Sequence, residues 1–350
     1  MENTTDLAFL PRVLLPWYAE NKRELPWRMD RDPYHIWVSE IMLQQTRVEA
    51  VREYYLRFIA ALPTVECLAN ASQELLYKLW EGLGYYSRVR NMKKAAQRIC
   101  EEYDGRFPSN FADILSLPGI GPYTAGAIAS IAFDQKTPAV DGNVLRVFAR
   151  LTNDMTPIDS QLFKKYATEQ LRGIYPAAAG DFTQALIELG ATICGPNRKP
   201  ACTNCPCNAY CMAYKEGTAD TLPVKSPKKQ RGIEEKTVFI LSCRGEYALE
   251  KRNESGLLAG LWQFPNCSGK MEMTEAVECL AGMGIQVRDL KRRVERNHIF
   301  THVEWNMAGI YIEVSEKSRM YTWFGAKTIS EEIALPTAFR RFWEEIEETP

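Results

Sequence analysis

Two hydrophobic patterns divide this chain, and they restrict it to a helical part followed by a part that contains a sheet. Apolar residues recur at helical spacing in several segments of the first two hundred residues, separated by short turns with Gly or Pro. These segments are Pro33–Tyr55, Gln73–Trp80, Val89–Tyr103, Thr124–Phe133 and Asp181–Ile193. A mainly α domain is therefore expected at the N-terminal end.

The pattern changes near residue 220. Thr221–Gly232 is polar, basic and contains proline, which is typical of a linker. Runs rich in β-branched and aromatic residues follow, at Lys236–Ser242, Tyr247–Arg252, Val303–Val314 and Met320–Phe324, with helices expected at Thr274–Met283 and Ala338–Glu348. We predict a helical domain over residues 1–218, a linker over 219–233 and an α+β domain over 234–350.

Composition limits the partners of the chain. No stretch reaches the roughly 18 apolar residues of a membrane-spanning helix, and Met1–Asp6 lacks the start of a secretion signal. We therefore expect a cytoplasmic protein without a membrane partner. The formal net charge is −1, so any nucleic acid must be bound by local patches or backbone amides.

A glycine-containing turn lies between two helical segments, in Leu117-Pro-Gly-Ile-Gly-Pro-Tyr-Thr. Gly119 and Gly121 permit a tight turn and expose backbone N–H groups where the next helix begins. Such amides, together with the helix dipole, suit a phosphate oxygen. The alternative is an ordinary glycine turn between packed helices.

This string resembles the helix-hairpin-helix of base-excision DNA glycosylases. In that superfamily an aspartate lies a short distance beyond the hairpin, and Asp141 matches it here. Some bifunctional relatives carry a nucleophilic lysine within the hairpin, where this chain has Tyr123. The resemblance therefore implies a monofunctional glycosylase without Schiff-base chemistry.

The segment Ile36–Arg47 carries Glu40 among apolar residues. An ionised carboxylate is costly to bury there, and such an environment raises a carboxyl pKa and suits a general acid. The alternative is a surface glutamate, or a helix-capping partner of Ser39. The same segment is similar to the catalytic segment of MutY-type adenine DNA glycosylases, whose glutamine pair matches Gln44 and Gln45.

The resemblance implies a role for each carboxylate. Glu40 would protonate the extruded adenine, and Asp141 would stabilise the oxocarbenium-like sugar, a division of labour known at other glycosidic bonds. Matches to family positions assign the supporting residues: Tyr123 and Asn143 for positioning, and Arg28 and Gln184 for the adenine pocket.

Aromatic residues and arginines alternate in Trp80–Arg90. A base extracted from a duplex leaves a gap that a planar side chain can fill. Resemblance assigns this wedge to Tyr85, with Gln45 entering from the other side and Arg88 among the DNA contacts. For Tyr86, packing in the core is an equal alternative.

Four cysteines follow the helical part, with the spacing Cys194-x7-Cys202-x2-Cys205-x5-Cys211. Four thiolates at such spacings can hold a [4Fe–4S] cluster or a zinc ion. The family has six residues in the first gap, so the seven here leave Cys207 as an alternative ligand. A [4Fe–4S] cluster is expected, with disulfides as the remaining alternative. Arg198 and Lys199 of this loop are expected to face DNA phosphate.

The segment Gly256–Pro265 resembles the entrance to a Nudix-type fold. A Nudix hydrolase would continue with an acidic helix that holds magnesium. Glu272, Glu275 and Glu278 do not reproduce that arrangement, so we expect the fold without the hydrolase chemistry.

MutY-type enzymes use such a domain to recognise 8-oxoguanine, and His298–His302 matches the recognising loop. Resemblance assigns a wedge to Phe300 and polar contacts to Thr301 and His302, with threonine where the family commonly has serine. Packing in the strand core is the alternative for Phe300, and a structural histidine for His302.

The sequence therefore predicts a monomeric repair glycosylase that hydrolyses adenine from double-stranded DNA containing A:8-oxoG or A:G mispairs. The rival hypotheses are an endonuclease III-like lyase, a non-catalytic mismatch-binding protein and a Nudix hydrolase of damaged nucleotides.

Overall fold

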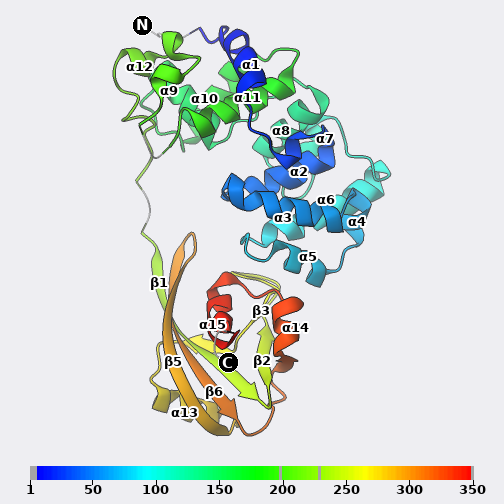
Figure 1. Ribbon diagram of the computed structural model, residues 1–350, viewed down its shortest axis with the longest axis vertical. Helices are drawn as coiled ribbons and strands as arrows, with labels where there is room; N and C mark the ends of the chain where they lie inside the picture. The colour runs from blue at the N-terminus through cyan, green and yellow to red at the C-terminus, as the bar shows by residue number, and fades with distance from the viewer. Residues whose placement is uncertain (1–5, 197–198, 228–229, 348–350) are drawn as a thin grey trace. The chain divides into compact units, whose positions relative to one another are not determined.

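The computed structural model describes residues 6–196, 199–227 and 230–347. Contacts between residues divide the chain into two compact units. The first unit comprises Met1–Asn70 and Arg90–Pro227, and the second comprises Ala71–Val89 and Lys228–Pro350 (Figure 1). The second unit therefore includes a segment that the sequence analysis placed in the N-terminal domain.

The first unit is helical throughout the part of it that the structure describes. Its helices are α1 (Leu10–Asn21), α2 (Pro33–Leu43), α3 (Val48–Ala61), α4 (Val65–Asn70), most of α6 (Ser87–Tyr103), α7 (Phe111–Ser116), α8 (Pro122–Phe133), α9 (Gly142–Thr152), α10 (Gln161–Arg172), α11 (Ala179–Thr192) and α12 (Met212–Lys215), with 3-10 turns η1 (Pro26–Arg28), η2 (Cys202–Asn204) and η3 (Asn208–Tyr210). The mainly α N-terminal fold is confirmed. None of the helices in the described residues is long and apolar enough to span a bilayer.

One expected helix is interrupted. The segment Pro33–Tyr55 was predicted as continuous, but α2 ends at Leu43 and α3 begins at Val48. Gln45 adopts a left-handed backbone with φ of 59°, which no α-helix accommodates. Hydrophobic spacing continues through the break, so periodicity alone gave no sign of it.

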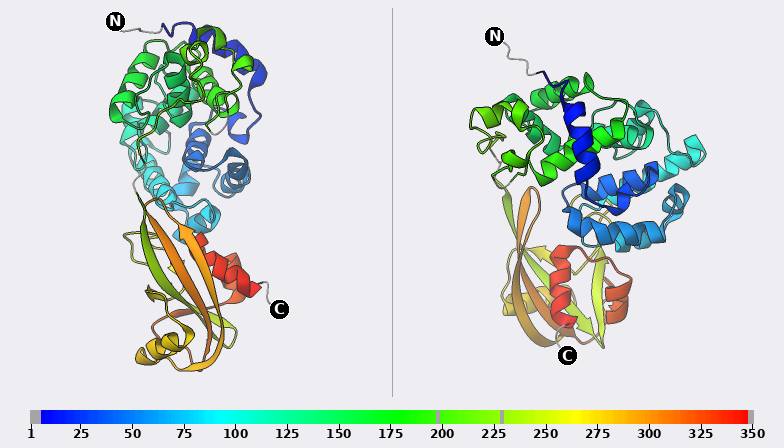
Figure 2. Two further views of the ribbon diagram at one scale, coloured as in Figure 1. Left: turned by 90° about the vertical axis from the view of Figure 1, so that its left-hand side faces the viewer. Right: turned by 45° about the horizontal axis from the view of Figure 1, so that its top comes forward.

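Helix α11 is central to the first unit, where it packs against α1, α8 and α9 (Figure 2), and one core cluster joins α1, α9, α10 and α11. Two glycines allow the close approaches. A Cβ on Gly126 of α8 would lie 2.4 Å from the Pro138 carbonyl oxygen, and one on Gly190 of α11 would lie 2.6 Å from Asn143 Cβ. Gly190 therefore lets α11 approach the start of α9.

The second unit contains a mixed sheet in the order β3-β2-β1-β6-β5, with β4 paired to β1 and β7 paired to β2. Its strands are β1 (Gly232–Cys243), β2 (Glu246–Lys251), β3 (Trp262–Gln263), β4 (Asn266–Ser268), β5 (Val287–Ile299), β6 (Val303–Val314) and β7 (Thr322–Gly325); its helices include α5 (Gln73–Trp80), α13 (Met273–Gly282), α14 (Ala326–Glu331) and α15 (Thr337–Glu347). The α+β C-terminal fold is confirmed.

Both faces of this sheet are covered. Val238 and Ile240 of β1 pack in one cluster with α15, whereas Phe239 and Leu241 pack in the other with α13. This alternation follows from the two-residue period of a strand. The helix α15 can be followed against the sheet in Figure 1.

Two further differences from the sequence analysis have physical causes. The strand β5 was not anticipated, because it is an edge strand rich in charged residues and lacks an apolar alternation. The expected linker is also shorter in the structure. Leu222 is buried in the first unit's core, its carbonyl accepts a hydrogen bond from Arg150 Nε at 3.0 Å, and β1 already begins at Gly232.

Replacing Gly190 by alanine is expected to destabilise the first unit by about 1–3 kcal/mol, because the new methyl group overlaps Asn143. In an open helix the same change is stabilising. Urea unfolding followed by helical circular dichroism measures the effect. The control is Gly173→Ala, whose nearest neighbour would lie at 3.6 Å, and equal stabilities of the two variants would contradict the expectation.

Candidate active site

Glu40 lies on α2, a helix that is almost wholly buried from Tyr34 to Met42. Asp32 begins this helix by accepting a hydrogen bond from the Tyr34 amide at 2.8 Å. The Glu40 side chain is reached from one side by Tyr123 of α8, whose hydroxyl donates to Oε2 at 2.6 Å. Glu40 is therefore a buried carboxyl group rather than a surface glutamate.

The environment of Glu40 raises its pKa to about 7. Burial is the largest cause, because it disfavours the ionised form, and the negative charge of Asp141 acts in the same direction. The Tyr123 hydrogen bond and the Arg28 charge oppose the rise. A carboxyl group poised near neutrality is suited to deliver a proton.

Asp141 is held at the start of α9. Its Oδ1 accepts from the Val144 amide at 2.8 Å, and its Oδ2 accepts from Asn143 Nδ2 at 2.6 Å. Burial raises the pKa of Asp141, while these two hydrogen bonds oppose the rise. The carboxylate is thus fixed in direction by groups that favour its charge.

Asn143 is fixed in turn by Arg146. Arg146 Nη2 donates to Asn143 Oδ1 and to the Gly190 carbonyl, each at 2.8 Å, and its Nε donates to the Cys194 carbonyl at 2.7 Å. A continuous series of hydrogen bonds therefore runs from Asp141 to the backbone of Cys194.

A cavity of about 540 Å³ opens between these elements. Glu40 and Asp141 both line it. So do six other residues that the sequence analysis named for the site: Arg28, Gln44, Gln45, Tyr123, Asn143 and Gln184. Gln44 and Gln45 reach it because the chain leaves the helical path after Leu43.

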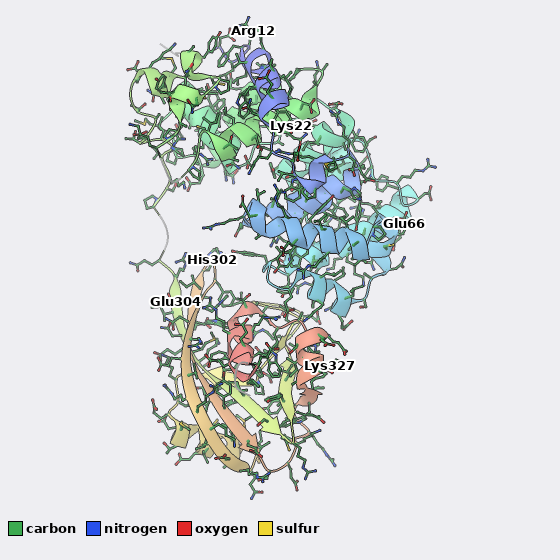
Figure 3. All side chains as sticks on the ribbon, viewed as in Figure 1. Arg12, Lys22, Glu66, His302, Glu304 and Lys327 are labelled. Carbon is green, nitrogen blue, oxygen red and sulfur yellow. The ribbon has the colours of Figure 1, made fainter. Side chains whose placement is uncertain are left out.

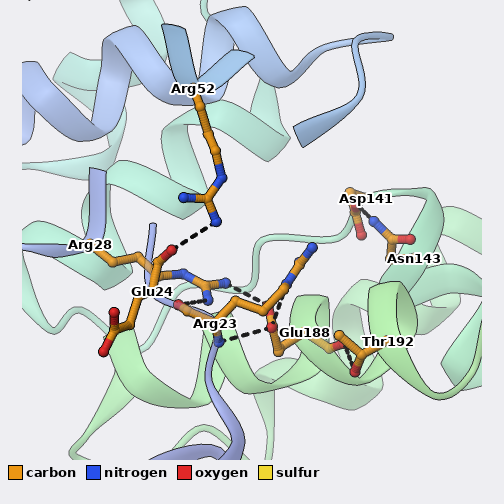
Figure 4. A network of polar contacts seen from close by, with 8 residues as sticks. All are labelled: Arg23, Glu24, Arg28, Arg52, Asp141, Asn143, Glu188 and Thr192. Atoms are coloured by element: carbon orange, nitrogen blue, oxygen red, sulfur yellow. Dashed lines mark hydrogen bonds and ion pairs between the residues drawn. The ribbon is translucent and has the colours of Figure 1, made fainter. Parts of the chain in front are cut away.

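One charged residue near this cavity was missed by the sequence analysis. Glu188 of α11 has a fully buried side chain and binds two arginines (Figure 4). Arg23 donates to it through Nε at 2.6 Å and Nη2 at 3.0 Å, and Arg28 Nη2 donates at 2.8 Å. Burial would raise the pKa of Glu188, but the hydrogen bonds and charges of the arginines hold it below its ordinary value.

This ion triad fixes the Arg28 side chain at the wall of the cavity. The sequence held a usable signal for it, since Glu188 lies one helical turn after Gln184 within an apolar segment. An acidic residue in that position is costly to bury without a partner.

The hairpin between α7 and α8 has the geometry of a tight turn. Gly119 has φ of 77°, and a Cβ there would lie 2.6 Å from Asn91 Cβ. Gly121 precedes Pro122, the first residue of α8, and has open space where a side chain would lie. The backbone at the start of α8 is therefore accessible to a phosphate group.

The cysteines line a separate, apolar cavity. Cys194, Cys202, Cys205, Cys207 and Cys211 all contribute to it. Arg150 Nη1 donates to the sulfur of Cys194 at 3.1 Å, a contact that favours a thiolate. Among the described residues, no group of three ligating side chains converges on a single-ion site. Arg198 lies outside the described residues, and Lys199 forms an ion pair with Asp220 at 3.7 Å.

The second unit contains the other residues named from the sequence. Tyr85 has φ of 47° and is 49% exposed, and its hydroxyl lies 2.8 Å from Thr301 Oγ1. Arg88 donates to the carbonyls of Leu83 and Gly84 at 2.9 and 3.1 Å, so it supports the turn that presents Tyr85.

The loop between β5 and β6 combines packed and exposed residues. The Phe300 ring packs on Trp305, with ring centres 4.8 Å apart, and on the cluster that includes α15. Thr301 and His302 are exposed in this loop, and His302 is labelled in Figure 3. Glu272 and Glu275, near the position of the Nudix acidic helix, form a capping box at the start of α13.

Comparison with known proteins agrees with both folds. The model of the HhH-GPD superfamily of base excision DNA repair proteins matches residues 38–171, and that of the NUDIX domain matches residues 237–345. The adenine DNA glycosylase of Rattus norvegicus is 36% identical, over 85% of this chain and 69% of its own length. That of Buchnera aphidicola from Schizaphis graminum is 32% identical, over 95% and 97%.

The chain belongs to the adenine DNA glycosylase family.

Solved structures agree with the fold of this glycosylase. A thermostable thymine-DNA glycosylase matches with a TM-score of 0.53 and 29% identity, over 61% of this chain and 98% of its own. An endonuclease III–DNA complex matches with a TM-score of 0.52 and 22% identity, over 62% and 99%. The second likeness concerns the fold alone. DNA glycosylases of this family hydrolyse N-glycosidic bonds.

The burial of Glu40 generates a stability prediction. Its pKa rises from 4.5 in the unfolded chain to about 7 in the folded one, so folded stability is lost as the pH rises through this window. Glu40→Gln cannot ionise, and its stability relative to the glycosylase itself should therefore increase by about 3 kcal/mol between pH 4 and pH 8.5. Urea unfolding at the two pH values measures this.

The matched control is Glu102→Gln, which removes a 48% exposed carboxylate paired with Arg98. Its effect should stay within about 0.5 kcal/mol at both pH values. A Glu40→Gln variant whose relative stability did not change with pH would show that the carboxyl group is not held in a desolvated state.

Proposed function

We propose that this glycosylase hydrolyses the N-glycosidic bond of adenine mispaired with 8-oxoguanine, or less efficiently with guanine, in double-stranded DNA. The observation that carries the proposal is the pair Glu40 and Asp141, which line one cavity large enough for a purine. Burial raises the pKa of both carboxyl groups, that of Glu40 to about 7, but Asp141 accepts hydrogen bonds from two N–H donors that favour its ionised form. This asymmetry suits one acid and one anion.

In the proposed reaction the adenine leaves the duplex and enters the cavity. Glu40 donates its proton to a ring nitrogen of the base, so the C1′–N bond breaks with its electron pair moving to the base. Asp141 stabilises the positive charge that develops on the sugar. A water molecule then adds to C1′ and releases its proton, which leaves an abasic site.

Three neighbours would support these steps. The Tyr123 hydroxyl orients the Glu40 carboxyl, Asn143 orients Asp141, and the triad with Glu188 fixes Arg28 at the wall that would face the base. Tyr123 also replaces the hairpin lysine of bifunctional relatives, so we propose no covalent amine intermediate and no strand cleavage. This distinguishes the proposal from an endonuclease III-like lyase.

Recognition of 8-oxoguanine is proposed for the second unit. Thr301 and His302 are exposed at the loop tip, where a hydroxyl and an imidazole are available to the altered edge of the base. Tyr85 would fill the gap left by the extruded base, since it is half exposed and held by an arginine-supported turn. The capping box at Glu272 and Glu275 leaves no acidic array for hydrolase chemistry in that helix.

A [4Fe–4S] cluster is proposed at Cys194, Cys202, Cys205 and Cys211. Their side chains line one shared cavity, and four thiolates at this spacing are a donor set that an iron–sulfur cluster uses. The donor set fits, since the Arg150 guanidinium points at the Cys194 sulfur. When bound, the group would supply a fold-stabilising cross-link, and Arg146 and Arg150 would hold the surrounding backbone.

The substrate assignment is tested with duplexes containing A:8-oxoguanine, A:G or thymine glycol. We expect alkali-dependent breaks at adenine, fastest opposite 8-oxoguanine. Alkali-independent nicking at thymine glycol would support the lyase instead. Binding to the mispair without any breaks would support a non-catalytic mismatch-binding protein.

Glu40→Gln is expected to lower single-turnover adenine release by at least about a hundredfold, because it removes the proton donor. Duplex affinity, measured by fluorescence anisotropy, should change little. Glu102→Gln again serves as the control and should release adenine at the unaltered rate. Undiminished turnover in Glu40→Gln would remove this residue from the mechanism.

The cluster is tested by iron and sulfide analysis of anaerobically purified protein. Cys194→Ser should lose the iron and the brown colour, whereas Cys207→Ser should keep both, since Cys207 is the cysteine outside the proposed set. Stoichiometric zinc in a colourless protein would contradict the assignment.

A further inference from the structure

Within the second unit, the segment Ala71–Val89 binds the C-terminal part of the chain at two separate places. One place is the end of α5, which binds the connection between α14 and α15. The other is Tyr85, which reaches the tip of the β5–β6 loop. Only three residues, Gly82 to Gly84, lie between Glu81 of the first contact and Tyr85.

The first contact is made by oppositely charged side chains one helical turn apart. Lys78 Nζ donates to the carbonyls of Ser330 at 2.7 Å and Ile333 at 3.3 Å, near the end of α14. Glu81 Oε1 accepts from the Leu335 amide at 3.1 Å and from Arg340 Nη1 at 2.6 Å. The two side chains also pair with each other, at 2.8 Å.

The Glu81 side chain is only 10% exposed, so this ion pair is shielded from water far better than an ordinary surface pair. The arrangement is also directional. A cation binds carbonyls and an anion binds an amide, so each backbone group meets the charge that complements its dipole.

The turn after Glu81 links the contact with the 330–340 segment to Tyr85. Gly82 and Gly84 have φ of 98° and 67°, and Arg88 donates to the carbonyls within the turn. The Arg88 guanidinium also lies over the rings of Trp80 and Tyr85, at 5.3 and 5.7 Å from their centres. Arg88 therefore contacts both the carbonyls within the turn and the aromatic rings at its two ends.

We propose that Glu81 is a positioning residue for lesion discrimination. Together with Lys78 it clamps the turn to the 330–340 segment, so that Tyr85 and Thr301 are presented to the lesion as one preformed surface. This inference rests on the proposed function, because it assigns a use to the proposed recognition of 8-oxoguanine. A site held loosely by about 1 Å loses much of its selectivity, which is why a supporting contact remote from the ligand matters.

The test compares single-turnover adenine release from A:8-oxoguanine and A:G duplexes by the full chain and by Glu81→Gln. Glutamine keeps the shape of the side chain but loses the charge that binds Arg340 and Lys78. The preference for 8-oxoguanine over guanine should fall about tenfold, which corresponds to about 1.4 kcal/mol. The rate on A:G should stay within about twofold, since the catalytic carboxylates are untouched.

A matched control is Glu344→Gln, which removes the more exposed partner of the same Arg340, at 3.5 Å. It should leave the preference unchanged. Hydrogen exchange provides an independent readout: amides of residues 82–88 should exchange at least about tenfold faster in Glu81→Gln than in Glu344→Gln.

Each outcome of these experiments either supports or overturns the proposed clamp. A Glu81→Gln variant that keeps the full preference overturns the clamp, and so does one that slows equally on both duplexes, because a general loss of folded enzyme acts on both. Arg340→Met should reproduce the Glu81→Gln effect, and the double variant should add little to it. If the unaltered protein excises adenine without preferring 8-oxoguanine, the proposed function fails first, whatever hydrogen exchange shows about the clamp.

Discussion

The proposed active site depends on a carboxyl group that the fold keeps away from water. Glu40 lies on a helix buried along nearly its whole length, so its ionised form is disfavoured and its pKa rises to about 7. The Tyr123 hydroxyl and the Arg28 charge limit that rise. Without them the group would hold its proton too firmly, and without burial it would have none to give at neutral pH. Activity and stability therefore oppose each other at this position.

Asp141 serves the fold and the site with the same atoms. Its Oδ1 caps α9 by accepting from the Val144 amide, while Oδ2 is held by Asn143. Arg146 continues this series of hydrogen bonds by donating to the Gly190 carbonyl on α11 and to the Cys194 carbonyl. Because Gly190 allows α11 to approach Asn143 so closely, a single methyl group on that helix is enough to disturb the carboxylate. Positional accuracy here comes from packing as much as from polar contacts.

The sequence predicted which residues gather at one cavity better than it predicted the continuity of helices and strands. Family resemblance named both carboxylates and the supporting residues Tyr123 and Gln184, and the structure places all four at one cavity, while their catalytic roles stay a prediction. The break at Gln45 was missed, since a left-handed residue leaves hydrophobic spacing intact. Strand β5 was missed because its many charged side chains obscure the alternation of apolar and polar residues by which a strand is recognised. Glu188 pairs with Arg23 and Glu81 pairs with Arg340, and a local sequence pattern cannot predict partners so distant along the chain.

The second unit is built from two stretches of chain that are made at very different times. Ala71–Val89 leaves the ribosome first, and the carbonyls, amide and guanidinium that bind Lys78 and Glu81 belong to residues 330–340, which are synthesised only after the intervening part of the chain. Helix α5 therefore remains without these partners while the residues between the two stretches are translated. A nascent chain can complete the core of the first unit earlier, but the turn that carries Tyr85 acquires this support only after residues 330–340 have been made.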